Sequence, residues 1–261
     1  MSTLLSVQEA QQKILSTFDA VSTLQAPLEY ACQRVLAEDI ISPIDLPSFP
    51  NSSMDGFAVR ARDVESASPE NPATLEIIAN LPAGALPDFQ IVERKTALIM
   101  TGAYLPLGAD AVVPVEQTNF HAHSPGDTLP NRVQVYQSVS PGAYVRPVGQ
   151  DIHQGQKVLE AGERLTAQAI GLLASLGIQQ VPLFRLPRVA IFSSGDELIT
   201  PSQPLQPGKI RDANSYMLRA LVEKYGGEVI WLGIAPDDPA IIREKFRAAV
   251  AQSADLIISS A

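Results

Sequence analysis

The spacing of apolar residues predicts two helices near the start of the chain. Ser6, followed three positions later by Glu9, forms a capping-box pattern, and apolar residues then recur every three or four positions. This predicts an amphipathic helix that ends near Asp19. A second helix is predicted from about Pro27 to Ala37, because proline suits the first turn of a helix and the apolar residues of this segment share one face.

From Pro43 to about Gly162 the pattern changes to short runs in which apolar residues are consecutive or alternate with polar ones. Clusters of proline, glycine, asparagine and aspartate separate these runs, which is typical of a β-rich region. The segment PSFPNSSMDGFAV is polar, contains two prolines and is predicted to form a long loop. The predicted strands lie in LEIIANL, ALIMTGAYL, DAVVPVEQT and RVQVYQSV.

Helical spacing returns at Thr166, a suitable N-cap for a helix that ends at Gly177. Beyond it three apolar strands, VAIFSS, EVIWLGI and DLIISS, alternate with two helices, for which Asn214 and Asp238 are the predicted N-caps. Strands that alternate with helices in this way predict a parallel sheet with right-handed crossovers.

These patterns predict a multidomain α/β protein. A helical, elongated N-terminal domain is expected from residues 1–44 and 147–177, with a β-rich, β-barrel-like domain of residues 45–146 inserted into it. Residues 178–261 are expected to form an incomplete three-layer αβα domain, because a three-stranded parallel sheet leaves two unpaired edges.

The charge balance narrows the classes of partner. The chain has 19 Lys and Arg residues against 28 Asp and Glu, a net charge of −9, which disfavours binding to nucleic acid and to anionic membrane surfaces. A single cysteine, Cys32, excludes an intrachain disulfide and a cysteine-rich metal site. The N-terminus lacks the pattern of a signal peptide, and no apolar run is long enough to span a membrane. A soluble protein of the cytoplasm is therefore expected.

Polar residues gather where the predicted parallel strands end, which is the edge at which ligands bind in open α/β sheets. Glu197 and Asp237 are compatible both with a metal or substrate site and with caps or solvent-exposed positions, whereas Asp238, before a proline, fits a helix cap best. The segment GKIRDANSYM offers a helix start that could hold a phosphate or a carboxylate, and a simple capped helix explains it as well. The candidates at this edge are Ser194, Gly195, Asp196, Glu197, Asp212, Asn214, Ser215, Asp237 and Asp238.

Three turns of the β-rich region carry further candidates. The polar cluster NSSMDG contains Asp55, a second turn contains Thr101, and a third contains Asp151 together with Arg146. An Asx-type turn explains the first cluster equally well. The chain has no P-loop, nucleophile elbow or dinucleotide-binding glycine motif. The residues alone therefore indicate an acidic, Mg²⁺-assisted site for a small molecule that carries phosphate.

Taken in order, these motifs resemble those of the molybdopterin molybdenumtransferase family, which includes bacterial MoeA and the gephyrin E domain. The strings NSSMDGFAV and TGAYLPLGADAVV are specific to that family. Further matches are LAEDI, VRPVGQDIHQGQKVLEAG, SSGDEL and GKIRDANSYML, so the resemblance covers essentially the whole chain.

The resemblance implies an elongated homodimer whose last domain, residues 178–261, is a truncated molybdopterin-binding-like α/β domain. It implies an enzyme of molybdenum cofactor biosynthesis that inserts molybdate into adenylylated molybdopterin, releases AMP and requires Mg²⁺. Molybdate and adenylylated molybdopterin would be its substrates, and other proteins of molybdenum cofactor biosynthesis would be its partners.

The resemblance also carries roles to individual positions. Glu197, with Asp237 or Asp238 or both, is expected to hold Mg²⁺ or the nucleotide, because a cation would let an acidic edge accept anionic substrates. The residues Ser194, Gly195, Asp196, Asp212, Asn214 and Ser215 are expected to bind the pterin substrate. The expected catalytic residues are Glu197 and, across a cleft and supplied by the other subunit, Asp55, Thr101 and Asp151.

The chain departs from the family pattern in three places. It has Ser193-Ser194 where the family has Ser-Thr, and the segment from Lys95 to Leu98 replaces one that contains an arginine in the family. The family also continues beyond the third parallel strand with a glycine-rich loop, more sheet and a β-barrel, so the chain is expected to represent its N-terminal portion. A non-catalytic scaffold that binds pterin or dimerises is the alternative function.

Overall fold

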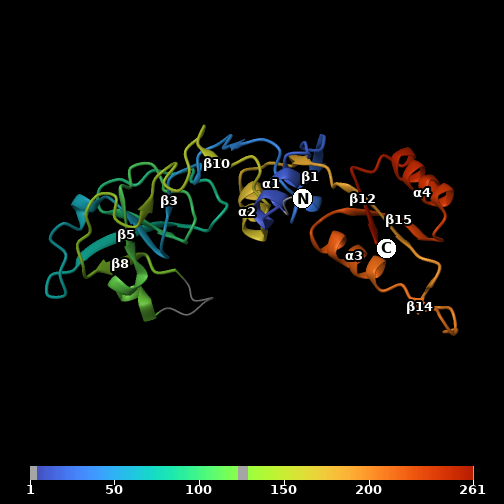
Figure 1. Cartoon of the computed structure of the whole chain (residues 1–261). Coiled ribbons are helices and arrows are strands. Elements are labelled where there is room, and N and C mark those ends of the chain that lie inside the picture. The colour runs from blue at the N-terminus through green and yellow to red at the C-terminus, as the bar shows by residue number, and fades with distance from the viewer. Residues whose placement is uncertain (1–4, 123–128, 261) are drawn as a thin grey trace. The chain divides into compact units, whose positions relative to one another are not determined.

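The computed structural model describes residues 5–122 and 129–260, and the chain divides into two compact units. One unit is Ile41–Val158, and the other combines Met1–Ile40 with Leu159–Ala261. Figure 1 shows the strand-rich first unit in blue-green to green and the parallel sheet of the second in orange and red. The division into three domains stays a prediction.

The unit Ile41–Val158 is built on a curled five-stranded sheet of order β7-β4-β6-β5-β8. Neighbouring strands are antiparallel, except that β5 and β6 are parallel. A bridge from Thr118, just after β7, to Val135 in β8 brings the two ends of the sheet together. A β-rich region is thus confirmed, and its barrel-like form stays a prediction. The strands are β4 (Gly56–Val59), β5 (Ala73–Leu81), β6 (Lys95–Ile99), β7 (Ala111–Pro114) and β8 (Arg132–Val135).

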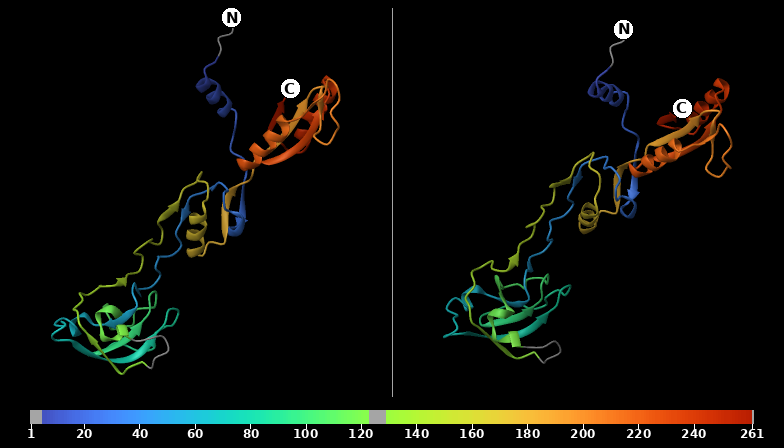
Figure 2. Two further views of the ribbon diagram at one scale, coloured as in Figure 1. Left: turned by 90° about the horizontal axis from the view of Figure 1, so that it is seen from below. Right: turned by 60° about the horizontal axis from the view of Figure 1, so that its bottom comes forward.

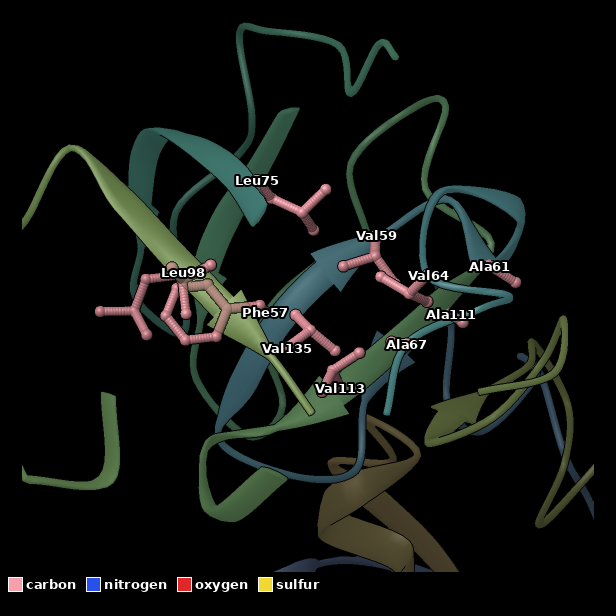
Figure 3. Close-up of a cluster of buried hydrophobic side chains, with 11 residues drawn as sticks. Phe57, Val59, Ala61, Val64, Ala67, Leu75, Leu98, Ala111, Val113 and Val135 are labelled. Atoms are coloured by element: carbon pink, nitrogen blue, oxygen red, sulfur yellow. The ribbon is translucent and has the colours of Figure 1, made fainter. Parts of the chain in front are cut away.

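Strand β4 is buried at all four positions, so the prediction of a loop was wrong for the end of PSFPNSSMDGFAV. Phe57 and Val59 belong to the apolar cluster drawn in Figure 3, and Ala58 belongs to a cluster on the opposite face of the sheet. Gly56 begins the strand where β7 passes very close, because a Cβ at this position would lie 2.1 Å from the carbonyl oxygen of Val113. Glycine is therefore required there.

In the other unit, β1 (Thr23–Pro27) and β11 (Gln180–Phe184) form an antiparallel pair, with α2 (Ala167–Ser175) beside them in both views of Figure 2. The hydroxyl of Thr166 accepts a hydrogen bond from the third residue of α2, and Gly177 follows the helix with φ +75°. The predicted start and end of this helix are confirmed.

The predicted second helix was wrong. Pro27 ends β1, a single 3-10 turn η1 (Leu28–Tyr30) follows, and Gln33 has φ +65°, which no α-helix contains. The N–H of Leu36 donates to the carbonyl oxygen of Glu163 at 2.9 Å. Pairing with residues far along the chain, which local spacing does not reveal, satisfies the backbone of this segment.

The last part of the chain forms a parallel sheet in which β12 (Arg188–Ser194) lies between β15 (Glu228–Ala235) and β16 (Leu256–Ser260). Helices α3 (Asn214–Lys224) and α4 (Pro239–Ala251) pack on these strands and flank β12 and β15 in Figure 1. The predicted βαβαβ order is confirmed. The three-layer form of the domain stays a prediction.

Helix α1 (Val7–Leu15) begins with both hydrogen bonds of the predicted capping box, between Ser6 and Glu9, and buries none of its residues. No helix within the described ranges is both long and apolar enough to cross a membrane. The remaining short elements are β2 (Ile40–Ile41), β3 (Asn51–Ser52), η2 (Ala61–Asp63), η3 (Val115–Gln117), η4 (Asn119–Ala122), β9 (Val145–Arg146), β10 (Lys157–Leu159), β13 (Leu198–Ile199) and β14 (Ile210–Arg211).

Candidate functional site

Asp55 lies in the turn before β4, and its carboxylate is bound by Thr101 from the turn after β6. The backbone N–H and the hydroxyl of Thr101 both donate to Oδ1 of Asp55, at 2.7 and 2.8 Å. These two hydrogen bonds, the backbone one first, lower the pKa of Asp55. Both residues are exposed, and Oδ2 of Asp55 has no partner within the described chain. An ionised carboxylate is therefore held with one oxygen available to a ligand.

Asp151 forms an ion pair with Arg146, whose Nη2 donates to Oδ2 of the carboxylate. Strand β3 connects this pair with the Asp55 turn, because Asn51 pairs with Arg146 and Ser52 hydrogen-bonds to the segment that follows Thr101. Asp55, Thr101 and Asp151 are thus carried by turns that meet at one short strand. These are three expected catalytic residues in one unit of the chain.

The expected sheet-edge residues lie in the other unit, at the carboxyl ends of β12 and β15. The N–H of Gly195 donates to the carbonyl oxygen of Ala235 (3.1 Å), and the N–H of Asp237 donates to Oδ1 of Asp196 (3.2 Å). These bonds join the loops that follow the two strands. The Glu197 carboxylate lies against Gly195, where an added Cβ would be 2.6 Å from its Oε2. Glu197, Asp196 and Asp237 are exposed, so the acidic groups face solvent.

Residues at the start of α3 form a buried polar network around Asp212, which is 4% exposed. The hydroxyl of Ser193 donates to Oδ1 of Asp212 at 3.0 Å, and the N–H of Ser215 donates to the same oxygen at 3.1 Å. The Ser215 hydroxyl donates to Oδ2. The Asp212 carboxylate therefore satisfies the first turn of α3, the role that an N-terminal cap plays.

The predicted N-cap Asn214 is thus wrong, because it is the first residue of α3 and its side chain makes no capping bond. Its Nδ2 donates instead to the hydroxyl of Ser260 at the end of β16, at 2.7 Å. Asp238 is confirmed as the N-cap of α4, since its Oδ1 accepts the N–H of Ala240 at 2.7 Å. One oxygen of Asp238 is therefore engaged by the helix.

The acidic edge fits the donor chemistry of Mg²⁺, which prefers carboxylate oxygens. The described residues contain no group of three or more His, Cys, Asp or Glu side chains arranged to hold a metal ion. Mg²⁺ commonly binds through one or two carboxylates, with water and substrate phosphate completing its shell. Glu197 and Asp237 are compatible with such a site, and Asp238 has one oxygen left for it.

Sequence reasoning placed Ser193 and Lys209 near this edge but did not predict their contacts. Ser193 binds the buried Asp212, and Lys209 donates to the carbonyl oxygen of Asp196 at 2.5 Å. The position of Ser193 in the apolar run VAIFSS was a usable signal, because a hydroxyl in a buried strand needs a partner. No local signal indicates the contact of Lys209, which lies 13 positions from Asp196.

Two family models match the chain along almost its whole length. The model described as "MoeA N-terminal region (domain I and II)" matches residues 5–177, and "Probable molybdopterin binding domain" matches residues 190–261. The chain belongs to the MoeA family. The motifs that contain Asp55 and Glu197 therefore lie within the segments that these two models match.

Curated MoeA relatives carry the name molybdopterin molybdenumtransferase. One from Nostoc sp. is 43% identical over 87% of the chain and 50% of its own length. Molybdopterin molybdenumtransferase 2 of Mycobacterium tuberculosis is 40% identical over 98% of the chain and 61% of its own length. The relative from Haemophilus influenzae is 38% identical with the same two coverages. The chain thus spans about half to three-fifths of the length of these relatives.

A solved MoeA structure has the same fold. The molybdopterin biosynthesis MoeA protein from Pyrococcus horikoshii OT3 is 35% identical, with a TM-score of 0.88 over 98% of this chain and 66% of that one. This likeness supports the mixed α/β fold class that the sequence predicted.

Proposed function

We propose that the chain acts in molybdenum cofactor biosynthesis as a molybdopterin molybdenumtransferase. The reaction would insert molybdate into the dithiolene of adenylylated molybdopterin and release AMP. The observation that carries this proposal is the match of both family models, in order, to residues 5–177 and 190–261. The names of the curated relatives support the same activity.

Two groups of residues would serve this reaction. At the sheet edge, Glu197 and Asp237 with Asp238 would hold Mg²⁺, which would supply positive charge between their carboxylates and the substrate phosphates. Supplied by the other subunit of a homodimer, Asp55 would stay ionised and point its second oxygen at the substrate, because Thr101 occupies only the first. Asp151, paired with Arg146, and the loop Ser194–Asp196 with the start of α3 would position the anionic substrate.

The test measures AMP release and molybdenum incorporation with purified chain, adenylylated molybdopterin, molybdate and Mg²⁺. Glu197→Gln and Asp55→Asn are expected to lower the rate at least about a hundredfold, a usual loss for a positioned charged group. Glu223→Gln is the matched control, because Glu223 pairs with Arg219 on the exposed face of α3. If Glu197→Gln reacted as fast as the unaltered chain, the assigned role of Glu197 would be wrong.

A homodimer, whether an enzyme or a scaffold, is supported by one further observation. Helix α1 and the residues after it expose a row of large apolar side chains, among them Val7 (79% exposed), Ile14 (58%) and Leu15 (61%). A helix that leaves its apolar side in solvent is typical of a partner surface. Sedimentation of the Ile14→Glu, Leu15→Glu variant tests this: monomers are expected, whereas an unchanged mass would exclude α1 from the dimer contact.

A scaffold and an enzyme are separated by the same turnover assay. A scaffold would bind molybdopterin and leave the rate of AMP release at the background level with the unaltered chain. Action in the cytoplasm, together with other proteins of the same pathway, is part of the enzyme proposal.

A further inference from the structure

The unit that contains the parallel sheet has a cavity of ≈ 310 Å³. It lies where β12 and β15 begin, whereas the candidate residues of the sheet edge lie where these strands end. Its lining comes from the segment before β1, the turn at residues 33–35, Arg164, the end of β11 with its connection to β12, and the turn between α3 and β15. The volume is at the lower end of the range for small-molecule sites.

Three arginines line this cavity in a chain whose net charge is −9. Arg185 is neutralised, because its guanidinium makes two hydrogen bonds to the carboxylate of Asp255, at 2.6 and 2.5 Å. Arg34 and Arg164 have no carboxylate within ion-pair distance in the described chain. Two positive charges therefore border one cavity without a counter-charge from the protein.

The hydrogen bonds of the two unpaired arginines go to backbone carbonyl groups. Nη1 of Arg164 donates to Gln33 at 2.8 Å, and its Nη2 donates to Tyr225 at 3.4 Å. Nη2 of Arg34 donates to Phe184 at 3.0 Å. These contacts fix both guanidinium groups but do not offset their charge.

The Nε atom of Arg34 is buried and has no hydrogen-bond partner among the residues that the structure describes. Buried polar atoms in folded proteins are nearly always paired, and an unpaired N–H on a charged group is especially unfavourable. Part of the hydrogen-bonding capacity of this guanidinium is therefore not met by the described chain. The rest of the lining is mainly apolar, with Val21, Val35 and Leu186 as its aliphatic members and Tyr225 at one side.

We propose that this cavity binds a small organic anion, with its carboxylate or phosphate on Arg34 and Arg164 and its apolar body against the aliphatic lining. A free inorganic anion would leave the apolar lining uncovered, and a neutral apolar molecule would gain no charge-assisted hydrogen bond from the two guanidinium groups. None of the cavity residues belongs to the groups assigned to molybdate insertion. The site is thus independent of the proposed function, and its occupant would tie the β11–β12 connection to the α3–β15 turn.

The experiment titrates the full chain with phenyl phosphate, benzoate, inorganic phosphate and benzyl alcohol. Binding is measured by calorimetry and by the NMR shift of the Gly226 amide. Saturable binding of phenyl phosphate or benzoate is expected, with a shift of Gly226, and weaker binding of the other two probes. Arg34→Gln and Arg164→Gln should each weaken binding about tenfold or more, the usual loss for a charge-assisted hydrogen bond. Arg62→Gln, in the other unit, is the control and should leave the affinity unchanged.

Two further measurements keep the result decisive if an arginine variant unfolds. Val21→Phe is expected to fill the cavity and abolish binding while both arginines remain, and rising salt is expected to weaken the binding of the unaltered chain. The proposal is overturned if no organic anion binds saturably at millimolar concentration. It is overturned equally if inorganic phosphate binds as tightly as phenyl phosphate, or if folded Arg34→Gln and Arg164→Gln bind like the unaltered chain.

Discussion

The carboxylate of Asp55 accepts two hydrogen bonds from a single residue, Thr101, and both reach the same oxygen, at 2.7 and 2.8 Å. The two residues are 46 positions apart and come from turns at the same end of β4 and β6. This arrangement lowers the pKa of Asp55 and leaves the other oxygen of the carboxylate unengaged by the described chain.

Thr101→Val is expected to raise the pKa of Asp55 toward its ordinary value. The variant removes the hydroxyl donor and keeps the backbone N–H, so part of the shift remains. A pH titration of the Asp55 carboxyl carbon by NMR measures the change. Thr101→Ser, which keeps the hydroxyl, is the control and should titrate like the unaltered chain. An identical pKa in the valine variant would contradict the role of the hydroxyl.

Asp255→Asn is expected to destabilise the unit that contains the parallel sheet at pH values above about 4, and to have less effect at lower pH. Hydrogen bonds from the Arg185 guanidinium and from the backbone N–H of Arg188 lower the pKa of Asp255 to about 2. Because this pKa lies below that of the unfolded chain, the stabilisation is present above about pH 4 and is lost as the pH falls toward 2. Allowing for solvent, the effect is about 1–2 kcal/mol.

Chemical denaturation of the Asp255→Asn variant at pH 6 and pH 2.5 measures this difference. The gap in the free energy of unfolding between variant and unaltered chain should shrink at the lower pH. Glu223→Gln, which breaks an exposed pair with Arg219, should change the free energy by less than about 0.5 kcal/mol at either pH. A gap for Asp255→Asn that is equal at both pH values would contradict the assignment.

Asp212→Ala is expected to destabilise the start of α3 by about 1–3 kcal/mol. The substitution leaves the buried hydroxyl of Ser193 and the N–H of Ser215 without their acceptor. Asn214→Ala is the matched control, because its side chain makes one exposed bond outside the helix and should cost well under about 1 kcal/mol. Hydrogen exchange of the first amides of α3 reports the difference, and an equal loss of protection in both variants would argue against Asp212 as the cap.

Much of the parallel sheet could be predicted from sequence, because its three strands are continuous apolar runs and its helices have caps or glycines at their ends. The segment after Pro27 could not, since the partner of Leu36 is Glu163, far along the chain. Asn214 suited a cap by residue type, and only the hydrogen bonds that Ser215 donates to Asp212 decide between them. The contact of Asp55 with Thr101 likewise depends on strand pairing, whereas the motifs that contain both residues were visible in the sequence.

Gly56→Ala is expected to unfold or strongly destabilise the unit Ile41–Val158. The added methyl group would lie 2.1 Å from the carbonyl oxygen of Val113, a backbone atom that the sheet holds in place. A cost of about 3 kcal/mol or more follows, at the upper end for an overpacked core. Gly84→Ala is the control, because it has φ +85° and open space around it and should cost only about 1–2 kcal/mol. Thermal denaturation measures both, and equal melting temperatures would contradict the close approach of β4 and β7.

The pairing of β1 with β11 sets an order of events during synthesis. Thr23 lies opposite Phe184, so β1 leaves the ribosome about 160 residues before its partner strand exists. At 5–20 residues per second this delay is roughly 8–30 s, during which the contiguous unit Ile41–Val158 has emerged in full. We therefore expect a nascent chain released at residue 175 to contain a folded, protease-resistant strand-rich unit while its first 40 residues remain open to cleavage. The inserted unit would fold first and bring the two halves of the other unit's chain to within reach of each other.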